Sequence, residues 1–260
     1  MKKILSIALV LVLALTMLAG CAEKAKVIVA EKESAGEAVA MELEGYEYTA
    51  VDTQAKAIME VSSGTADAAI VDYVMSIGSI GEGTDYENLV VSGEGYSPEN
   101  YGIAFRKGSD VTAKVNEAIK ALKDNGKLNE IAKTYKLEDL ITADAEFDAF
   151  EQAEKDSDWE YIKNKGELVI GITYFAPMNY ENEDGELVGF ETEFAKAVCA
   201  ELGVNAKFQE ISWNAKETEL AAKNIDCIWN GMTITDERAE AMSITIPYMA
   251  NKQVMVVKEK

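Results

Sequence analysis

Apolar residues recur along this chain in two alternating patterns, short continuous runs and spacings of three or four positions. The runs are typical of buried strands, and the spacings indicate helices that pack one face on a core. We expect strands at 26–30, 47–51, 67–72, 87–91, 168–172, 187–190, 206–210, 225–229, 243–248 and 253–257, and a turn at 97–102. We expect helices at 35–41, 54–62, 73–80, 111–125, 128–135, 159–165, 194–202 and 216–223, and another that opens at Asp236. Strands alternating with helices predict an α/β fold with ligand sites at the carboxyl ends of its strands.

Residues 138–158 interrupt this alternation. They are acidic and alanine-rich, and Phe147 and Phe150 are scattered among them. Such a composition indicates a solvated segment rather than part of a core. We therefore predict a connector here, in the form of a solvated helix.

The amino-terminal residues have the pattern of an export signal. Lys2 and Lys3 precede an apolar run from Ile4 to Leu18, which is too short for a membrane span. The run ends in Leu18-Ala19-Gly20-Cys21, which resembles the lipobox of bacterial lipoproteins. We expect residues 1–20 to be a signal peptide, Cys21 to be lipidated, and 21–25 to be a tether. An ordinary signal followed by an incidental cysteine is the alternative.

Charge narrows the possible partners. The sequence has 25 basic and 46 acidic residues, so removal of residues 1–20 with their two lysines leaves a net charge of −23. Such a chain repels phosphate backbones and anionic membrane faces, so we expect no nucleic-acid partner and a membrane anchor made of lipid. The sequence also lacks histidine, which excludes Ser-His-Asp and Cys-His catalysis and removes the commonest metal ligand. We expect no metal and no cofactor.

Two further cysteines fall in apolar patterns. Cys199 lies on the apolar face of a predicted helix and Cys227 in a predicted strand. Both fit small buried hydrophobic residues, and a disulfide between them stays open because connectivity cannot be read from a sequence.

The stretch from Asn224 to Arg238 carries the clearest chemistry. A strand-like run breaks at Asn230-Gly231, and Thr233 or Thr235 can then cap a helix that begins with Asp236 and Glu237. Backbone N–H groups, a hydroxyl and the guanidinium of Arg238 can therefore converge on one anion. A solvated arginine at a helix end is the alternative.

A carboxylate ends another predicted strand. Asp72 follows the run from Ala68 to Val71 and precedes a helix that begins at Tyr73. Its local interpretation is an N-cap for that helix. At a strand end it can equally bind an ammonium group.

Together these segments resemble the extracellular solute-binding proteins of family 3, which bind polar amino acids for ABC importers. Residues 159–257 resemble the first half of that family, through Gly171-Ile-Thr-Tyr-Phe-Ala-Pro177, Asp184-Gly-Glu-Leu-Val-Gly-Phe190, Phe194-Ala-Lys-Ala-Val198, Asn224-Ile-Asp-Cys-Ile228, Met232-Thr-Ile-Thr-Asp-Glu-Arg238 and Ile246-Pro-Tyr248. Residues 26–137 resemble the second half, through Gly36-Glu-Ala-Val39, Val51-Asp-Thr53, Ser63-Gly-Thr-Ala-Asp-Ala68, Val71-Asp-Tyr73 and Tyr101-Gly-Ile-Ala-Phe-Arg-Lys-Gly108.

The two halves stand in reversed order. The resemblance therefore implies a two-lobed periplasmic-binding-protein-like fold (type II), circularly permuted, with surface termini relinked by the connector. We expect lobe 2 at 26–100, the helical part of lobe 1 at 101–137, the connector at 138–158, and the main part of lobe 1 at 159–260. One of the two crossings between lobes should be interrupted.

The resemblance also implies roles for individual residues. Arg238 would hold the ligand α-carboxylate with the N–H of Thr233 and with Ser34 at a helix N-terminus, and Asp72 would bind the α-ammonium with Gly231 and Thr233. Phe175 and Trp213 would contact the ligand side chain, although either can equally be core packing. Tyr174, Trp229 and Asn230 are weaker candidates. Because the basic-amino-acid binders carry an acid shortly before the aromatic, where this chain has Ile172-Thr173-Tyr174, a neutral or polar side chain is favoured.

The function implied is that of an amino-acid-binding lipoprotein on the extracytoplasmic face of the cell membrane. It would be a monomer without chemistry of its own, and it would deliver a free L-amino acid to the permease of an ABC transporter. An enzyme on the same fold, of the cyclohexadienyl or arogenate dehydratase kind, is one alternative and would need a general acid such as Glu210. A ligand-sensing domain is the other.

Overall fold

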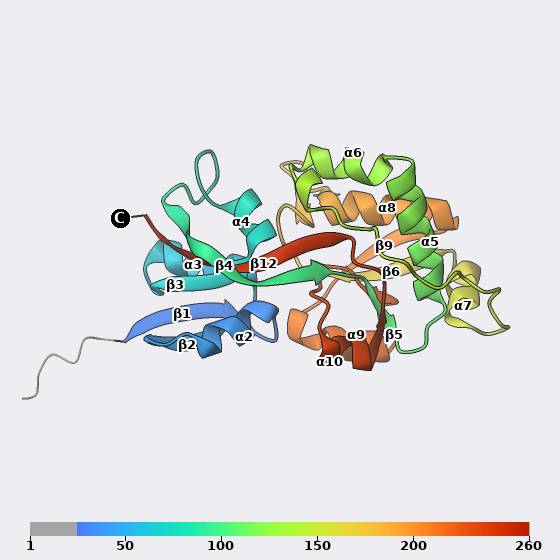
Figure 1. The fold of residues 1–260 in the computed structure, drawn as a ribbon, viewed down its shortest axis with the longest axis horizontal. Coiled ribbons are helices and arrows are strands. Elements are labelled where there is room, and N and C mark those ends of the chain that lie inside the picture. The colour runs from blue at the N-terminus through green and yellow to red at the C-terminus, as the bar shows by residue number, and fades with distance from the viewer. Residues whose placement is uncertain (1–24, 260) are drawn as a thin grey trace, which may run out of the picture.

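The computed structural model describes residues 25–259 and shows two lobes joined by long strands (Figure 1). The predicted signal peptide 1–20 and the predicted lipidation site Cys21 lie outside the described residues. Within the described part, no helix has the length and apolar character needed to cross a membrane.

Lobe 2 is built on a five-stranded sheet with the order β2-β1-β3-β12-β4. Its strands are β1 (Lys26–Glu31), β2 (Tyr46–Val51), β3 (Ala68–Asp72), β4 (Leu89–Tyr101) and β12 (Met249–Lys258). Its helices are α2 (Ala35–Glu42), α3 (Gln54–Ser63) and α4 (Tyr73–Ser79). The side chains of Ser34 and Thr53 cap α2 and α3 by accepting hydrogen bonds from backbone N–H groups of these helices.

Lobe 1 is built on a second five-stranded sheet with the order β11-β5-β10-β6-β9. Its strands are β5 (Ala104–Arg106), β6 (Glu167–Ile172), β9 (Asn205–Glu210), β10 (Cys227–Ile228) and β11 (Met242–Ile244), and a short hairpin adds β7 (Tyr180–Glu181) and β8 (Leu187–Val188). Its α-helices are α5 (Val111–Asp124), α6 (Lys127–Thr134), α7 (Asp158–Lys165), α8 (Phe190–Leu202), α9 (Lys216–Ala221) and α10 (Asp236–Ala241). The 3-10 turns η1 (Glu138–Leu140) and η2 (Trp213–Ala215) complete it. Cys199 and Cys227 are buried here as free thiols, as the apolar patterns favoured.

The two sheets share one topology. In lobe 2, β1 lies between β2 and β3, and in lobe 1, β6 lies between β9 and β10. In each sheet, a strand that arrives from the other lobe pairs with β3 or β10 respectively. This strand is β12 in lobe 2 and β5 in lobe 1. The predicted two-lobed, periplasmic-binding-protein-like α/β fold (type II) is confirmed.

Both crossings between the lobes are continuous, which corrects the predicted interruption. β4 leads through Gly102 into β5, and β11 leads into β12, which pairs antiparallel with β4 from Met249↔Tyr101 to Lys258↔Leu89. The prediction placed all of 159–260 in lobe 1, whereas β12 also pairs with β3 and so belongs to the sheet of lobe 2. An apolar run predicts a strand but does not name its partner, because strand pairing is not local in sequence.

The segment after η1 differs from the predicted solvated helix. Residues 142–154 contain no helix or strand, and the backbone N–H of Thr142 donates to the carbonyl of Tyr248. The Phe150 ring lies edge-on to Trp159 with 6.4 Å between centroids, and Lys114 Nζ lies 4.8 Å from the centre of the Phe150 ring. The aromatic residues therefore fasten the connector to lobe 1 as an irregular strap.

Candidate functional site

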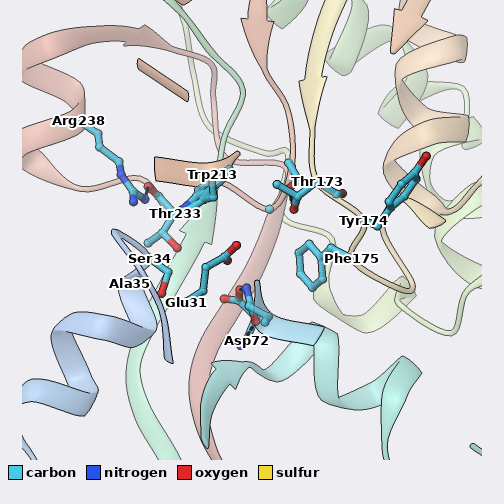
Figure 2. Close-up of a pocket in the computed structure, with 13 residues that line it drawn as sticks. Glu31, Ser34, Ala35, Asp72, Thr173, Tyr174, Phe175, Trp213, Thr233 and Arg238 are labelled. Atoms are coloured by element: carbon cyan, nitrogen blue, oxygen red, sulfur yellow. Dashed lines mark hydrogen bonds between the residues drawn. The ribbon is translucent and has the colours of Figure 1, made fainter. Parts of the chain in front are cut away.

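The candidate site is a cavity between the lobes, at the carboxyl ends of strands from both sheets. It holds about 380 Å³ of empty space. Its lining residues are Glu31, Ser34, Ala35, Gln54, Asp72, Thr173, Tyr174, Phe175, Trp213, Asn230, Gly231, Thr233 and Arg238. Figure 2 shows Arg238 and Thr233 on one side and Ser34 and Asp72 on the other. All of the residues predicted to bind ligand line this cavity, with the exception of Trp229.

Arg238 supplies the cationic side of the cavity from lobe 1. The Thr235 hydroxyl caps α10 by accepting a hydrogen bond from the Arg238 N–H at 3.2 Å. The guanidinium donates to the carbonyl of Thr233 at 2.8 Å and, across the cleft, to the carbonyl of Glu33 at 3.3 Å. Burial lowers the pKa of Arg238. The fully solvated arginine of the alternative interpretation is therefore not what the structure shows.

Asp72 supplies an anionic side from lobe 2. Asp72 is 5% exposed and occupies the predicted N-cap position of α4, but its side chain makes no capping hydrogen bond to that helix. It accepts hydrogen bonds from Asn251 Nδ2 at 2.5 Å, from Gln253 Nε2 at 2.7 Å, and from Gln54 Nε2. Burial outweighs these donors and raises the pKa of Asp72.

Aromatic side chains form the walls of the cavity. Phe175 and Trp213 are buried, and the guanidinium carbon of Arg238 lies 5.9 Å from the centre of the Trp213 ring. Tyr174 is more exposed, and its hydroxyl donates to Glu181 at 3.0 Å. Aromatic rings therefore form the apolar part of the lining, close to the two charged groups.

Several polar groups of the cavity already have partners within the chain. The Thr233 hydroxyl donates to Glu99 at 2.9 Å, and the Gly231 N–H donates to Glu191 at 2.8 Å. The Asn230 carboxamide accepts a hydrogen bond from the Thr173 hydroxyl and donates one to the Thr173 carbonyl. The Ser34 hydroxyl accepts from the Glu37 N–H at 3.1 Å. These hydrogen bonds hold the polar residues of the cavity wall in place.

Trp229 lies in the core of lobe 1, which corrects its prediction as a weaker ligand candidate. Its ring is completely buried and meets Phe194 edge-on, with 5.1 Å between centroids. Successive side chains of an extended segment point to opposite faces. Asn230 therefore lines the cavity while its neighbour packs beneath it.

Four residues that line the cavity were missed, namely Glu31, Ala35, Gln54 and Thr173. Glu31 ends β1 as Asp72 ends β3, and this shared strand-end position is the signal that could have identified it. It was overlooked because it opens the charged run Glu31-Lys-Glu-Ser34, which looks exposed. Burial and the charge of Asp72 raise the pKa of Glu31 to about 8. Glu210, the acid considered for an enzyme, is exposed and does not line the cavity.

Comparison with known sequences identifies a family that this chain resembles. The family "Bacterial extracellular solute-binding proteins, family 3" matches residues 168–260. The L-cystine-binding protein TcyJ of Escherichia coli (strain K12) is 33% identical over 99 residues, which are 38% of this chain and 37% of the relative. The L-arginine-binding protein of Pseudomonas aeruginosa is 34% identical over 91 residues, 35% of each chain.

A solved structure also matches part of the chain. It is the arginine-bound form of domain 1 from TmArgBP, at 31% identity and a TM-score of 0.34, with 38% of this chain and 85% of that one covered. This chain spans little more than a third of the length of the two curated relatives above. The similarity to the bacterial extracellular solute-binding proteins, family 3, therefore rests on residues 168–260.

Proposed function

We propose that this protein is the substrate-binding lipoprotein of an amino-acid ABC importer, and that it closes its lobes around a free L-amino acid. The observation that carries the proposal is that Arg238 from lobe 1 and Asp72 from lobe 2 line one cavity. A zwitterion offers a carboxylate to the first and an ammonium to the second. Each charge is worth most when both are shielded from water, which requires the lobes to be closed.

The binding steps follow from the positions of these groups. The carboxylate meets the guanidinium of Arg238, and the N-terminus of α2 with Ser34 adds a favourable dipole from lobe 2. The ammonium meets Asp72, whose three amide donors hold it in place. Phe175 and Trp213 enclose the side chain. Ligand and closure are therefore coupled, because contacts from both lobes are complete only in the closed form.

The relatives support the same class of ligand. Their names assign L-cystine and L-arginine to them, and both are free amino acids. The permease partner, the lipid anchor at Cys21 and the extracytoplasmic location are the further parts of the proposal.

The proposal includes the circular permutation. In the described residues the last part of β12 and the first part of β1 lie at the same end of the lobe 2 sheet, beside the start of β3. Val256 pairs with Ala69, and Ile28 pairs with Ala68. β3 alone separates these two strands. Joining them would give a chain in which lobe 1 comes first, with the connector 138–158 as the new opening.

A thermal-shift screen of the mature protein against the common L-amino acids tests the function. A ligand at a hundred times its Kd adds about 2.7 kcal/mol, which raises the melting temperature by about 5–10 °C for a protein of this size. We expect Arg238→Ala and Asp72→Asn each to abolish the shift. Lys223→Ala and Asp124→Ala remove equal charges from exposed positions and should preserve it.

Two outcomes would refute the proposal. A shift that persists in both cleft variants would mean that the ligand binds elsewhere. Turnover of arogenate or prephenate by the wild-type protein, followed by mass spectrometry, would favour the enzyme instead.

A further inference from the structure

Glu31 brings a second carboxylate into the cavity, and no protein group satisfies it. Its side chain is 4% exposed, and its Oε1 is buried without a hydrogen-bond partner in the described structure. In Figure 2 this side chain points into the space between Arg238 and Phe175. A buried acceptor left unpaired costs roughly 1–3 kcal/mol, and more when it is charged. Its position therefore indicates that the ligand supplies a hydrogen-bond donor to Glu31.

The neighbouring charged groups do not supply that donor. Asp72 is an acid, and its oxygens are occupied by three amides. Lys216 Nζ lies 4.9 Å from the centre of the Trp213 ring and contacts the carbonyl of Glu33 at 3.5 Å. Among residues 25–259 it makes no ion pair with Glu31 within 4.0 Å. Arg238 donates to the carbonyls of Thr233 and Glu33.

The charges of the cleft lead to the same conclusion. An α-amino acid places its carboxylate on Arg238 and its ammonium on Asp72, so neither of these two charged groups remains to pair with Glu31. Glu99, which is partly buried and accepts a hydrogen bond from Thr233, is a further acid of the cleft and makes the local potential more negative when ionised. A ligand with one more positive charge would complete the balance.

We infer that Glu31 is a specificity-determining residue, and that the ligand is an L-amino acid with a second cationic group, a guanidinium or an ammonium, on its side chain. This inference rests on the proposed function and names its ligand class. It differs from the neutral or polar side chain predicted from the sequence. Glu31 comes from β1 of lobe 2, whereas the acid of the basic-amino-acid binders is expected just before the aromatic residue, which here is Phe175 of lobe 1.

Matched ligand pairs test the inference without altering the protein. L-arginine and L-citrulline have similar length and shape but differ in charge, and L-lysine can be compared with Nε-acetyl-L-lysine. Isothermal titration calorimetry should show that the wild type prefers each cation at least about tenfold, as expected of a shielded charge-assisted hydrogen bond. Equal or tighter binding of the neutral member in both pairs would overturn the inference.

A variant then assigns the preference to Glu31. Glu31→Gln keeps the shape and removes the charge, so arginine and citrulline should bind with similar affinity. Lys216→Met is the control, because it removes a nearby charge while leaving Glu31, and it should keep the arginine preference. A preference that survives in Glu31→Gln would show that another acid reads the cation.

The pH dependence gives a second readout. The charged groups acting on Glu31 are Asp72, which raises its pKa, and Lys216, which lowers it, and burial brings that pKa to about 8. Glu31 must lose its proton to accept a cation, so arginine affinity should rise as pH increases from 6 to 8.5. The rise should be absent for citrulline and for Glu31→Gln. Failure of every amino acid to bind would instead refute the proposed function.

Discussion

Burial affects the acids of this cleft differently according to the donors around each. Asp72 has three amide donors, and Glu191 accepts from the Gly231 N–H and the Asn179 side chain, both at 2.8 Å. Burial nevertheless raises the pKa of Glu191 to about 7 and that of Glu31 to about 8. Both values exceed the unfolded value of 4.5, so these groups stabilise the ligand-free fold most at low pH and lose that contribution as pH rises to about 8.

Gly231 allows the Phe175 ring to lie close to the backbone of the cavity, because glycine has no side chain there. Its φ is +56°, and a Cβ at this position would lie 2.6 Å from Cε1 of Phe175. We therefore expect Gly231→Ala to displace the Phe175 ring and to weaken ligand binding at least about tenfold, with a loss of stability of about 1–3 kcal/mol from backbone strain. Calorimetric titration and chemical denaturation measure the two effects.

Gly203→Ala is the matched control for this prediction. Gly203 has a φ of +71° at the end of α8, and a Cβ there meets nothing within 4 Å. It should lose stability through the same backbone strain but keep wild-type affinity. Equal affinities in the two alanine variants would contradict the role given to the Phe175 contact.

Single residues also show the limit of sequence reasoning. Arg238 and Asp72 could be found because their types and positions at element ends are informative locally. Glu31 could not be separated from the exposed charges that follow it, because the cleft that buries it forms from both lobes. Trp229 was wrongly included among the weaker ligand candidates, because the direction of its side chain is set by packing against Phe194, a contact that is not local in sequence.

At the scale of elements, capping and periodicity predicted most helices within a few residues. Ser34, Thr53 and Thr235 cap their helices with hydroxyls, and Thr235 is one of the two caps that the sequence offered for α10. The sheet that β12 joins could not be predicted, because its apolar alternation fits either lobe. The connector was expected to be helical because alanine and acidic residues favour helices, but its phenylalanines pack on lobe 1 and hold it in an extended path.

Phe150 tests how far the strap contributes to lobe 1. Its backbone N–H donates to Glu117 at 3.1 Å, and its half-buried ring lies between Lys114 and Trp159. We expect Phe150→Ala to lower the free energy of unfolding by about 1 kcal/mol, roughly half the value of a fully buried side chain. Urea denaturation followed by circular dichroism measures it.

Glu151→Ala provides the comparison on the same strap. Glu151 is exposed, so this change should stay within about 0.5 kcal/mol of the wild type. If both variants match the wild type, the strap is held by its ends rather than by its aromatic residues.

At the scale of the whole molecule, two paired crossings form the joint between the lobes. β4 and β12 run antiparallel through it, and a Cβ at Gly102 would lie 2.7 Å from Cγ2 of Ile244. The crossings are therefore in close contact where they leave lobe 2. The proposed closure of the cleft would bend both strands at this joint and so keep the approach of Arg238 to Asp72 on one path.

Relinking the chain tests the proposed permutation at this scale. A protein that joins Lys258 to Lys26 and opens in the strap near residue 148 would contain every described helix and strand. The gap covers two strand spacings, about 10 Å, which a flexible linker of about four to six residues spans. We expect it to fold with a melting temperature within about 5 °C of the parent and to keep the amino-acid shift, because no core contact is cut. A second relinked protein, opened at Gly102, would separate β4 from β5 and should lose the shift even if each lobe folds. If the strap-opened protein is unfolded, the connector is part of the fold's core and the permutation proposal fails.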